Sequence, residues 1–179
     1  FAAFTRPGRG AGVNTPFPLS PLKFQNRIRL GLTGPDGKVK HETPWMSNIL
    51  TTFGLASLAS MVGSGAGVNA STLVSAMKIG TGTTAATSTD TSLVASTGSV
   101  VITAASLTKT NLGNRTVEYQ ATFASNNPAG SAVINEIALY CNSTAESQAA
   151  ARAVLGTASV NKLASDTINA SYQIIFTTA

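Results

Sequence analysis

The spacing of hydrophobic and polar positions predicts a mainly β protein with one helix. Between residues 23 and 32, apolar side chains occupy even positions and cations occupy odd ones, the period of two of a half-buried strand. The run Gly34-Pro35-Asp36-Gly37 predicts a turn, because proline suits the second turn position and glycine closes it. Residues 38–41 would then form the return strand of a hairpin.

Residues 48–62 carry apolar side chains at helical spacing, with Ser47 as the expected N-cap. The glycine-rich run 63–67 would end this helix and form a flexible connection. The apolar stripe of the helix, which includes Phe53 and Met61, is expected to pack into the core.

From residue 76 onward, short strand-like runs are separated by turn-forming residues. Candidate strands are 76–80, 99–106, 115–124, 133–141, 151–156 and 166–177. The runs 117–123 and 168–176 alternate apolar and polar side chains, and the whole pattern favours an antiparallel β-sandwich. The expected fold is therefore an antiparallel β-sandwich with one short helix and an extended basic N-terminal arm.

Charge and proline content divide the chain near residue 44. Residues 1–44 hold seven Lys and Arg against two acids, and six of the seven prolines, whereas residues 45–179 hold five basic residues and five acids. This predicts a basic, proline-rich arm and hairpin over 1–44, followed by a sandwich body over 45–179 with a helix at its start. The candidate partner-binding residues of the arm are Phe1, Phe4, Arg6, Arg9, Phe17, Lys23, Arg27 and Arg29.

Charged residues make up 11% of the chain, below the roughly 25% usual in soluble proteins. Low charge weakens the repulsion between copies and favours a subunit packed among neighbours. We expect the cationic arm to dock onto an acidic protein surface. Nucleic acid is the less favoured partner, because no reading helix, zinc module or aromatic platform accompanies the cations. No apolar run approaches 18 residues, so no membrane span is expected.

The chemistry-bearing residues do not suggest catalysis. His41 is the only histidine and lies beside Lys40 and Glu42, without a pattern that supplies a nucleophile and its base. Cys141 is the only cysteine, which precludes an intrachain disulfide, and we expect it to be a buried, inert thiol. The glycine-threonine run 80–84 lacks the Gly-Lys-Ser/Thr ending of a phosphate-binding loop and is expected to be a turn. We therefore expect no enzyme activity, no cofactor, no metal site and no small-molecule substrate.

The run 77–93 (MKIGTGTTAATSTDTSL) resembles a segment common in structural proteins of tailed bacteriophages. The runs 118–123, 134–140, 151–153 and 166–176 resemble later parts of the same pattern in the same order, so the likeness covers about residues 76–179. The resemblance implies a β-sandwich virion protein in the tail, baseplate or fibre attachment, or on the head surface, with no catalytic residues. The basic leader lies outside this pattern.

These features predict a non-enzymatic virion protein, assembled in the bacterial cytoplasm and fastened by its arm to other virion proteins. Self-association is also expected, with a trimer among the options. A capsid decoration protein is one alternative, and a host-surface carbohydrate-binding adhesion module, which would need exposed aromatic platforms, is another. Within the body, Glu136 is expected to pair with Arg152 across strands in a stabilising role.

Overall fold

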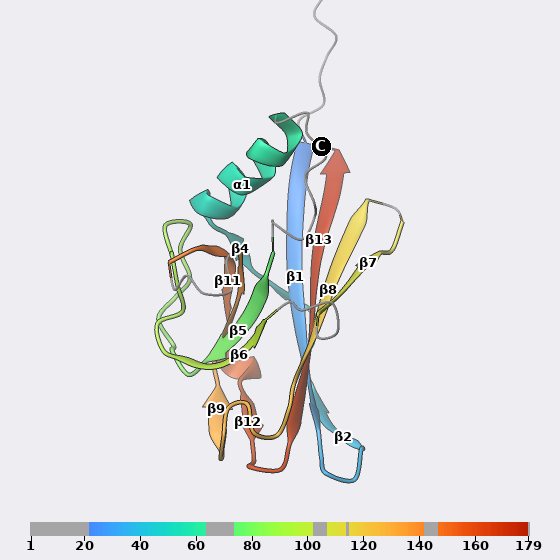
Figure 1. Ribbon diagram of the computed structural model, residues 1–179, viewed down its shortest axis with the longest axis vertical. Helices are drawn as coiled ribbons and strands as arrows, with labels where there is room; N and C mark the ends of the chain where they lie inside the picture. Colours follow the sequence, from blue (N-terminus) through green and yellow to red (C-terminus); the bar gives the residue numbers. More distant parts are fainter. Residues whose placement is uncertain (1–21, 64–73, 102–106, 114, 142–146, 179) are drawn as a thin grey trace, which may run out of the picture.

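In the computed structural model, two antiparallel sheets pack face to face, which confirms the mainly β, sandwich-like fold predicted from the sequence (Figure 1). The structure describes residues 22–63, 74–101, 107–113, 115–141 and 147–178. In Figure 1, β1 and β13 lie side by side along the long axis, and the single helix α1 lies at the end where β13 finishes.

Each sheet combines strands that are far apart in the sequence. The first sheet has the order β2 (Val39–Glu42), β1 (Leu22–Thr33), β13 (Thr167–Thr178), β8 (Thr116–Phe123) and β7 (Leu107–Asn111), with β3 (Met46–Ser47) also paired to β1. The second sheet has the order β4 (Ile49–Leu50), β11 (Ala149–Val154), β10 (Glu136–Tyr140), β5 (Ala76–Gly80) and β6 (Ser96–Val101). A small third sheet pairs β12 (Val160–Lys162) with β9 (Ala132–Ile134), and a 3-10 turn spans Gly156–Ala158.

The pairing of β1 with β13 extends over all 12 residues of each strand. Because successive side chains point to opposite faces of a strand, Ile28 and Leu30 lie on the inner face, opposite Tyr172 and Ala170. All four are buried. The alternation in residues 23–32 therefore correctly predicted which face of β1 enters the core.

One hydrophobic core fills the space between the two sheets. β1, β8 and β13 supply one side of it, and β5, β10 and β11 supply the other. Its fully buried large side chains include Ile28, Leu30, Phe123 and Tyr172 from the first sheet and Met77, Ile79, Ile137 and Leu139 from the second. Burial of these side chains from both sheets holds the layers together.

The hairpin predicted at residues 23–41 is present. Gly37 has a positive φ of 76°, and its N–H donates to the Gly34 carbonyl at 3.0 Å. The Asp36 carboxylate accepts from the Lys38 N–H at 3.1 Å, which fixes the loop leading into β2.

The division predicted at residue 44 does not coincide with a structural boundary. β1, which was assigned to the arm, lies between β13 and β2 in the main sheet, and β3 pairs with β1 directly after Trp45. The Thr43 N–H donates to the Leu30 carbonyl at 2.8 Å. Residues 22–44 therefore belong to the body, because their apolar row is needed to complete its core. The change in charge marks a different surface, and residues 1–21 lie outside the described residues.

The predicted helix over 48–62 begins later than expected, and Ser47 is not its N-cap. The helix α1 spans Thr52–Gly63, and Thr51 caps it by accepting from the Gly54 N–H at 3.0 Å. Residues 46–47 and 49–50 form β3 and β4 instead, because pairing with β1 and β11 outweighs their local helical pattern. Phe53 is 36% exposed and so is not a core residue as predicted, whereas Leu58 does pack against the core.

The other predicted strands are found with shifted ends. The run 133–141 is divided into β9 and β10 at Asn135, whose N–H donates to the Gly80 carbonyl and whose amide donates to the Thr81 carbonyl. The run 99–106 corresponds to β6, with residues 102–106 outside the described part. No local pattern in the sequence predicts the short β3, β4 and β12, or β7.

Candidate docking face

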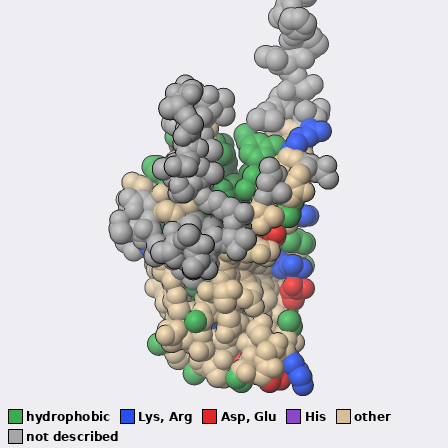
Figure 2. Space-filling model, turned by 45° about the vertical axis from the view of Figure 1, so that its right-hand side comes forward, with side chains coloured by type: hydrophobic (Ala, Val, Ile, Leu, Met, Phe, Trp, Pro, Cys, Tyr) green, Lys and Arg blue, Asp and Glu red, His purple; other side chains and the backbone are tan. Residues whose placement is uncertain are grey.

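The outer face of the first sheet carries the described residues of the predicted partner-binding set. Phe1, Phe4, Arg6, Arg9 and Phe17 lie outside the described residues. Lys23, Arg27 and Arg29 occupy alternate positions of β1 on the side away from the core. In Figure 2 most of the visible Lys, Arg, Asp and Glu side chains gather along the right-hand edge, whereas the described part of the surface that faces the viewer is mostly uncharged.

Arg27 and Arg29 are brought together by the ring of Trp45. The guanidinium carbon of Arg27 lies 4.6 Å from the centroid of this ring, and that of Arg29 lies 4.9 Å from it. Trp45 is half-buried and lies in the connection between β2 and β3. Glu42, at the end of β2, lies beside Arg29, with 3.2 Å between Glu42 Oε1 and Arg29 Nη1. Lys23 is exposed at the start of β1 and does not join this cluster.

A row of polar side chains continues from Arg27 across the sheet. Arg27 Nε donates to Gln173 Oε1 at 2.8 Å, and Gln173 Nε2 donates to Glu118 Oε1 at 3.1 Å. Gln120 Nε2 donates to the other oxygen of Glu118, also at 3.1 Å. The row follows the register Arg27↔Gln173↔Glu118. The Arg27 side chain is therefore held at its Nε atom by its own sheet.

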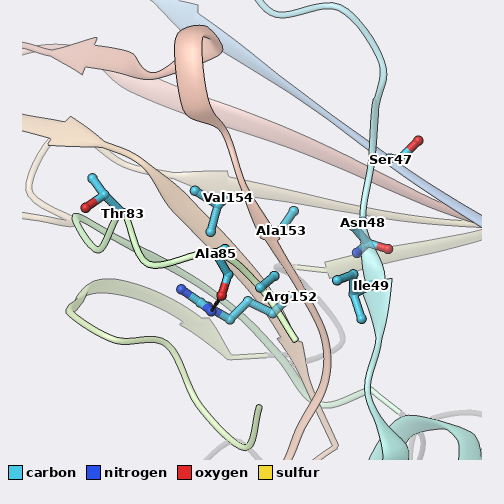
Figure 3. Close-up of a pocket in the computed structure, with 9 residues that line it drawn as sticks. Ser47, Asn48, Ile49, Thr83, Ala85, Arg152, Ala153 and Val154 are labelled. Carbon is cyan, nitrogen blue, oxygen red and sulfur yellow. Dashed lines mark hydrogen bonds between the residues drawn. The ribbon is translucent and has the colours of Figure 1, made fainter. Parts of the chain in front are cut away.

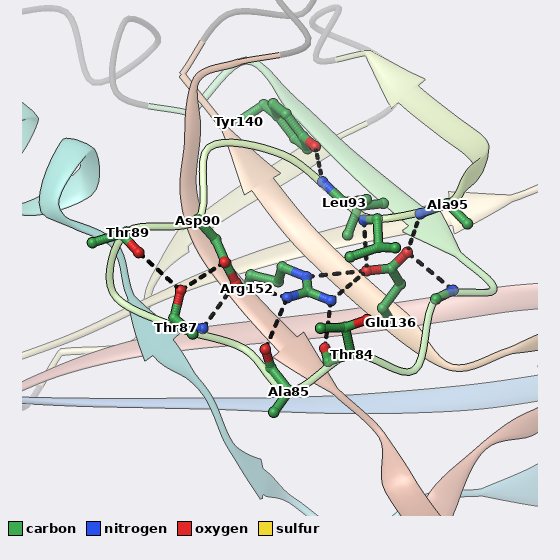
Figure 4. Close-up of polar contacts among 12 residues, drawn as sticks. Thr84, Ala85, Thr87, Thr89, Asp90, Leu93, Ala95, Glu136, Tyr140 and Arg152 are labelled. Carbon is green, nitrogen blue, oxygen red and sulfur yellow. Dashed lines mark hydrogen bonds and ion pairs between the residues drawn. The ribbon is translucent and has the colours of Figure 1, made fainter.

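The second sheet has charged side chains on its outer face too, but there they are buried. The connection between β5 and β6, residues 81–95, lies over this face (Figure 4). Arg152 on β11 donates from Nε and Nη2 to Glu136 Oε2 at 3.0 and 2.9 Å, and from Nη1 to Asp90 Oδ2 at 2.7 Å. Its remaining donors reach the carbonyls of Thr84 at 2.8 Å and Ala85 at 3.4 Å. The predicted pairing of Glu136 with Arg152 is confirmed, and the structure adds Asp90.

Glu136 also accepts three backbone N–H groups of the covering loop. They come from Gly82 at 3.1 Å, Val94 at 3.1 Å and Ala95 at 2.7 Å. A Cβ on Gly82 would lie 2.5 Å from Glu136 Oε1, so a larger residue there would force the carboxylate or the loop to move. The glycine-threonine run was predicted to be a simple turn. Its Gly82 N–H instead joins those of Val94 and Ala95 around an anion, and that anion is the protein's own Glu136 carboxylate.

Asp90 holds the middle of the loop. Partial burial of its carboxylate opposes ionisation, but hydrogen bonds from Thr87 and Arg152, together with the guanidinium charge, lower its pKa below the usual 3.8. Asp90 accepts from the Thr87 N–H at 2.8 Å and from the Thr87 hydroxyl at 2.7 Å. Tyr140 fixes the loop further along by accepting from the Leu93 N–H at 2.8 Å.

Two further charged side chains are buried at the end that carries β9 and β12. Lys162 Nζ donates to the carbonyls of Ser125, Gly130 and Leu163 at 2.8 to 3.3 Å, and burial lowers its pKa. Asp166 accepts from Lys40 Nζ at 2.6 Å, and this contact lowers the pKa of the carboxyl group. These groups fasten the turns at this end of the sandwich.

A pocket of about 380 Å³ lies between the link to β4, the end of β11 and the loop at 83–86 (Figure 3). Arg152 is one of its lining residues. A guanidinium has five N–H groups, and the five contacts given above use all of them. Arg152 therefore offers no donor to a ligand in this pocket.

Other chemistry-bearing residues are spread over the fold. His41 is exposed on β2, and Cys141 is half-buried at the end of β10, where burial raises the pKa of its thiol. Within the described residues, no group of three or more His, Cys, Asp or Glu lies close enough together to hold a metal ion. In the same residues, no helix has both the length and the apolar character to cross a membrane.

Comparison of the chain with protein-family models, curated proteins and solved structures gave no match.

The sequence had pointed to Arg27 and Arg29 but not to Trp45, their shared contact. The signal available was a lone tryptophan placed just after a cationic strand and its return strand. Gln173 and Glu118 lie in the same polar row as Arg27 because of the register between β1, β13 and β8, which the sequence does not reveal.

Proposed function

We propose that this chain is a non-enzymatic structural component of a tailed-phage virion. It assembles into the tail, baseplate or fibre-attachment region, and its N-terminal arm anchors it to neighbouring subunits. The proposal rests on the sequence resemblance over residues 76–179 together with the way the arm joins the sandwich.

The observation that carries the anchoring role is the pairing of β1. Residues 1–21 continue directly into this strand, which is bonded to β13 along all 12 of its residues and to β2 and β3 on its other side. A pulling force on the arm would act on β1, an interior strand with a long ladder of backbone hydrogen bonds. An edge strand with few partners would give a weaker attachment.

The use of buried charge also supports a structural role. Arg152, Glu136 and Asp90 hold the covering loop, and Lys162 and Asp166 hold turns. In each case the ionisable group is committed to a contact within the chain. The segment that resembles phage structural proteins, residues 77–93, includes most of the loop that this network fastens.

A head decoration protein remains the alternative placement, with the same arm and the same self-association, a trimer included. A carbohydrate-binding adhesion module has less support, because Tyr119, Tyr140 and Tyr172 are at most 3% exposed and cannot offer a platform to a sugar. Such a module would have to use partly exposed rings such as Trp45, Phe24 and Phe53.

The test is incorporation into tailed particles assembled in a bacterial host. Three versions are compared: the full chain, a truncation that begins at Leu22, and the full chain with Arg6→Gln and Arg9→Gln. The amount of each in purified particles is measured by quantitative mass spectrometry. We expect the truncation to fold, because β1 is intact, but to be lost from particles, with the charge variant reduced.

Absence of the full chain from purified particles would overturn the virion assignment. Normal incorporation of the truncation would overturn the anchoring role alone. Electron microscopy of particles that carry a labelled subunit then distinguishes the tail from the head.

A further inference from the structure

We propose that Arg27, Arg29 and Trp45 form a receptor for carboxylate side chains on an acidic segment of a neighbouring virion protein. This inference rests on the proposed function, and it adds the chemistry of the partner that the outer face of the first sheet accepts. These three residues are called the Arg–Trp–Arg cluster below.

Arg27 is positioned before any partner arrives. Its Nε is engaged by Gln173 at 2.8 Å, and its guanidinium carbon lies 4.6 Å from the centroid of the Trp45 ring. In the described part of the chain, the hydrogen bond of Arg27 uses only its Nε. Its two terminal nitrogens can therefore offer a fork of donors to a partner. A fork of this kind matches the two oxygens of a carboxylate. Because the side chain is already held, less rotamer entropy is lost on binding.

Arg29 supplies a second cation that can change partners. Its Nη1 lies 3.2 Å from Glu42 Oε1, with the two side chains 37% and 52% exposed. An exposed ion pair of this kind contributes at most about 1 kcal/mol and exchanges readily. An incoming carboxylate can therefore share Arg29 with Glu42, or replace Glu42 at Arg29, with little loss of free energy.

The signs of charge around the cluster favour an acidic protein over nucleic acid. Glu42 lies beside Arg29, and Glu118 lies in the same polar row as Arg27. A nucleic acid backbone carries a phosphate at every step and would meet Glu42 and the negative charge of the buried Glu118, whereas a protein segment can place single carboxylates at the cations only. The chain's own arm has the wrong sign, because residues 1–21 contain Arg6 and Arg9 and no acid.

The cluster also disfavours a sugar as the occupant. Carbohydrate platforms use the open face of an aromatic ring, and here two guanidinium groups lie over the ring of Trp45. The same arrangement strengthens carboxylate binding, because it keeps two cations close together on one support.

Trp45 makes the proposal directly testable, because it is the only tryptophan in the chain. The intact protein is titrated with poly-L-glutamate while tryptophan emission is followed. We expect a saturable change in emission, with an affinity that falls as salt rises. A double variant, Arg27→Gln with Arg29→Gln, should bind about tenfold or more weakly, since two charge-assisted contacts are lost.

Two comparisons keep the result specific. Lys38→Gln in the β1–β2 turn removes one positive charge away from the cluster and should leave binding within about twofold, because its side chain is 84% exposed and screened. Arg27→Lys with Arg29→Lys keeps the charge but removes the fork, and should weaken binding by an intermediate amount. Unchanged thermal unfolding of the variants shows that a loss of binding is not a loss of folding.

Several results would overturn the proposal. They are an emission that does not respond to poly-L-glutamate, equal losses in Lys38→Gln and in the double variant, or tighter, Arg27-dependent binding of duplex DNA. In particles, normal incorporation of the double variant would overturn the receptor while the virion assignment stands. Conversely, arginine-dependent binding by a chain that is absent from particles would retain the receptor and remove the virion assignment.

Discussion

The two outer faces of the sandwich use the same pair of residue types in opposite ways. On the first sheet, Arg29 and Glu42 lie 3.2 Å apart with side chains 37% and 52% exposed. On the second sheet, Arg152 and Glu136 lie 2.9 Å apart with side chains 1% and 0% exposed. Exposed pairs contribute little to stability and are free to exchange, whereas loss of one partner from a buried pair is costly.

The difference arises from the loop at residues 81–95. This loop covers the second sheet, where a small cluster that includes Leu93, Ala138 and Tyr140 is buried beneath it. The first sheet has no such connection among the described residues, so its cations remain accessible. One face is therefore suited to holding the chain together and the other to binding a neighbour.

The largest effect is expected from Arg152→Ala. This change leaves Glu136 buried without its cation and releases the carbonyls of Thr84 and Ala85. We expect a loss of about 3–5 kcal/mol in the free energy of unfolding, measured by urea denaturation. Arg29→Ala is the matched control and should lose less than about 2 kcal/mol, because it removes only an exposed ion pair and one contact with the Trp45 ring. Equal losses in the two variants would mean that the two faces do not differ as described.

Gly82→Ala is expected to have the next largest effect. The added Cβ would lie 2.5 Å from Glu136 Oε1, so the loop or the carboxylate must move. We expect about 1–3 kcal/mol of destabilisation by the same measurement. Gly31→Ala is the control, because its Cβ would meet only Asn169 O at 3.8 Å, an ordinary contact. A Gly82→Ala protein as stable as Gly31→Ala would show that the loop is not held against Glu136.

How much of each face could be predicted depends on how far apart in the sequence the interacting residues lie. Strand periodicity is local, so β1 and its inward side chains Ile28 and Leu30 could be read directly from the sequence. The pairing of Glu136 with Arg152 also follows from two neighbouring strands. The role of Asp90 could not be predicted, because a loop must fold back over the sheet to bring it there.

The start of α1 was predicted wrongly, because a local pattern was outweighed by a distant strand. Residues 48–50 have helical spacing, but Ile49 and Leu50 are taken up by β4, which pairs with β11 about a hundred residues later. Gly54 marks the true first turn, since its close approach to the Ala150 carbonyl leaves no room for a side chain. Tertiary pairing of this kind leaves no local signal.

A smaller, pH-dependent effect is expected from Asp90→Asn. Because the folded pKa of Asp90 is lowered, its contribution to stability is complete above the unfolded value of 3.8 and is lost as pH falls through the folded pKa. The variant should therefore lose less stability than wild type when unfolding is followed from about pH 6 down to about pH 2. Part of the acid sensitivity should remain, because the pKa of Asp166 is lowered too. An unchanged acid profile would mean that Asp90 does not hold the loop through its charge.

The smallest effect on stability is expected from Trp45→Ala, although it removes the centre of the proposed receptor. Trp45 is half-buried and contacts two exposed or half-exposed guanidinium groups, and such cation–π contacts are worth about 0.5–1 kcal/mol each at accessible sites. Unfolding is best followed by far-UV circular dichroism, since the variant has no tryptophan. A loss of about 2 kcal/mol or less, with weaker binding of poly-L-glutamate measured by isothermal titration calorimetry, would separate docking from folding. A loss as large as that of Arg152→Ala would instead make the Arg–Trp–Arg cluster part of the folded framework, and the contrast between the two faces would fail.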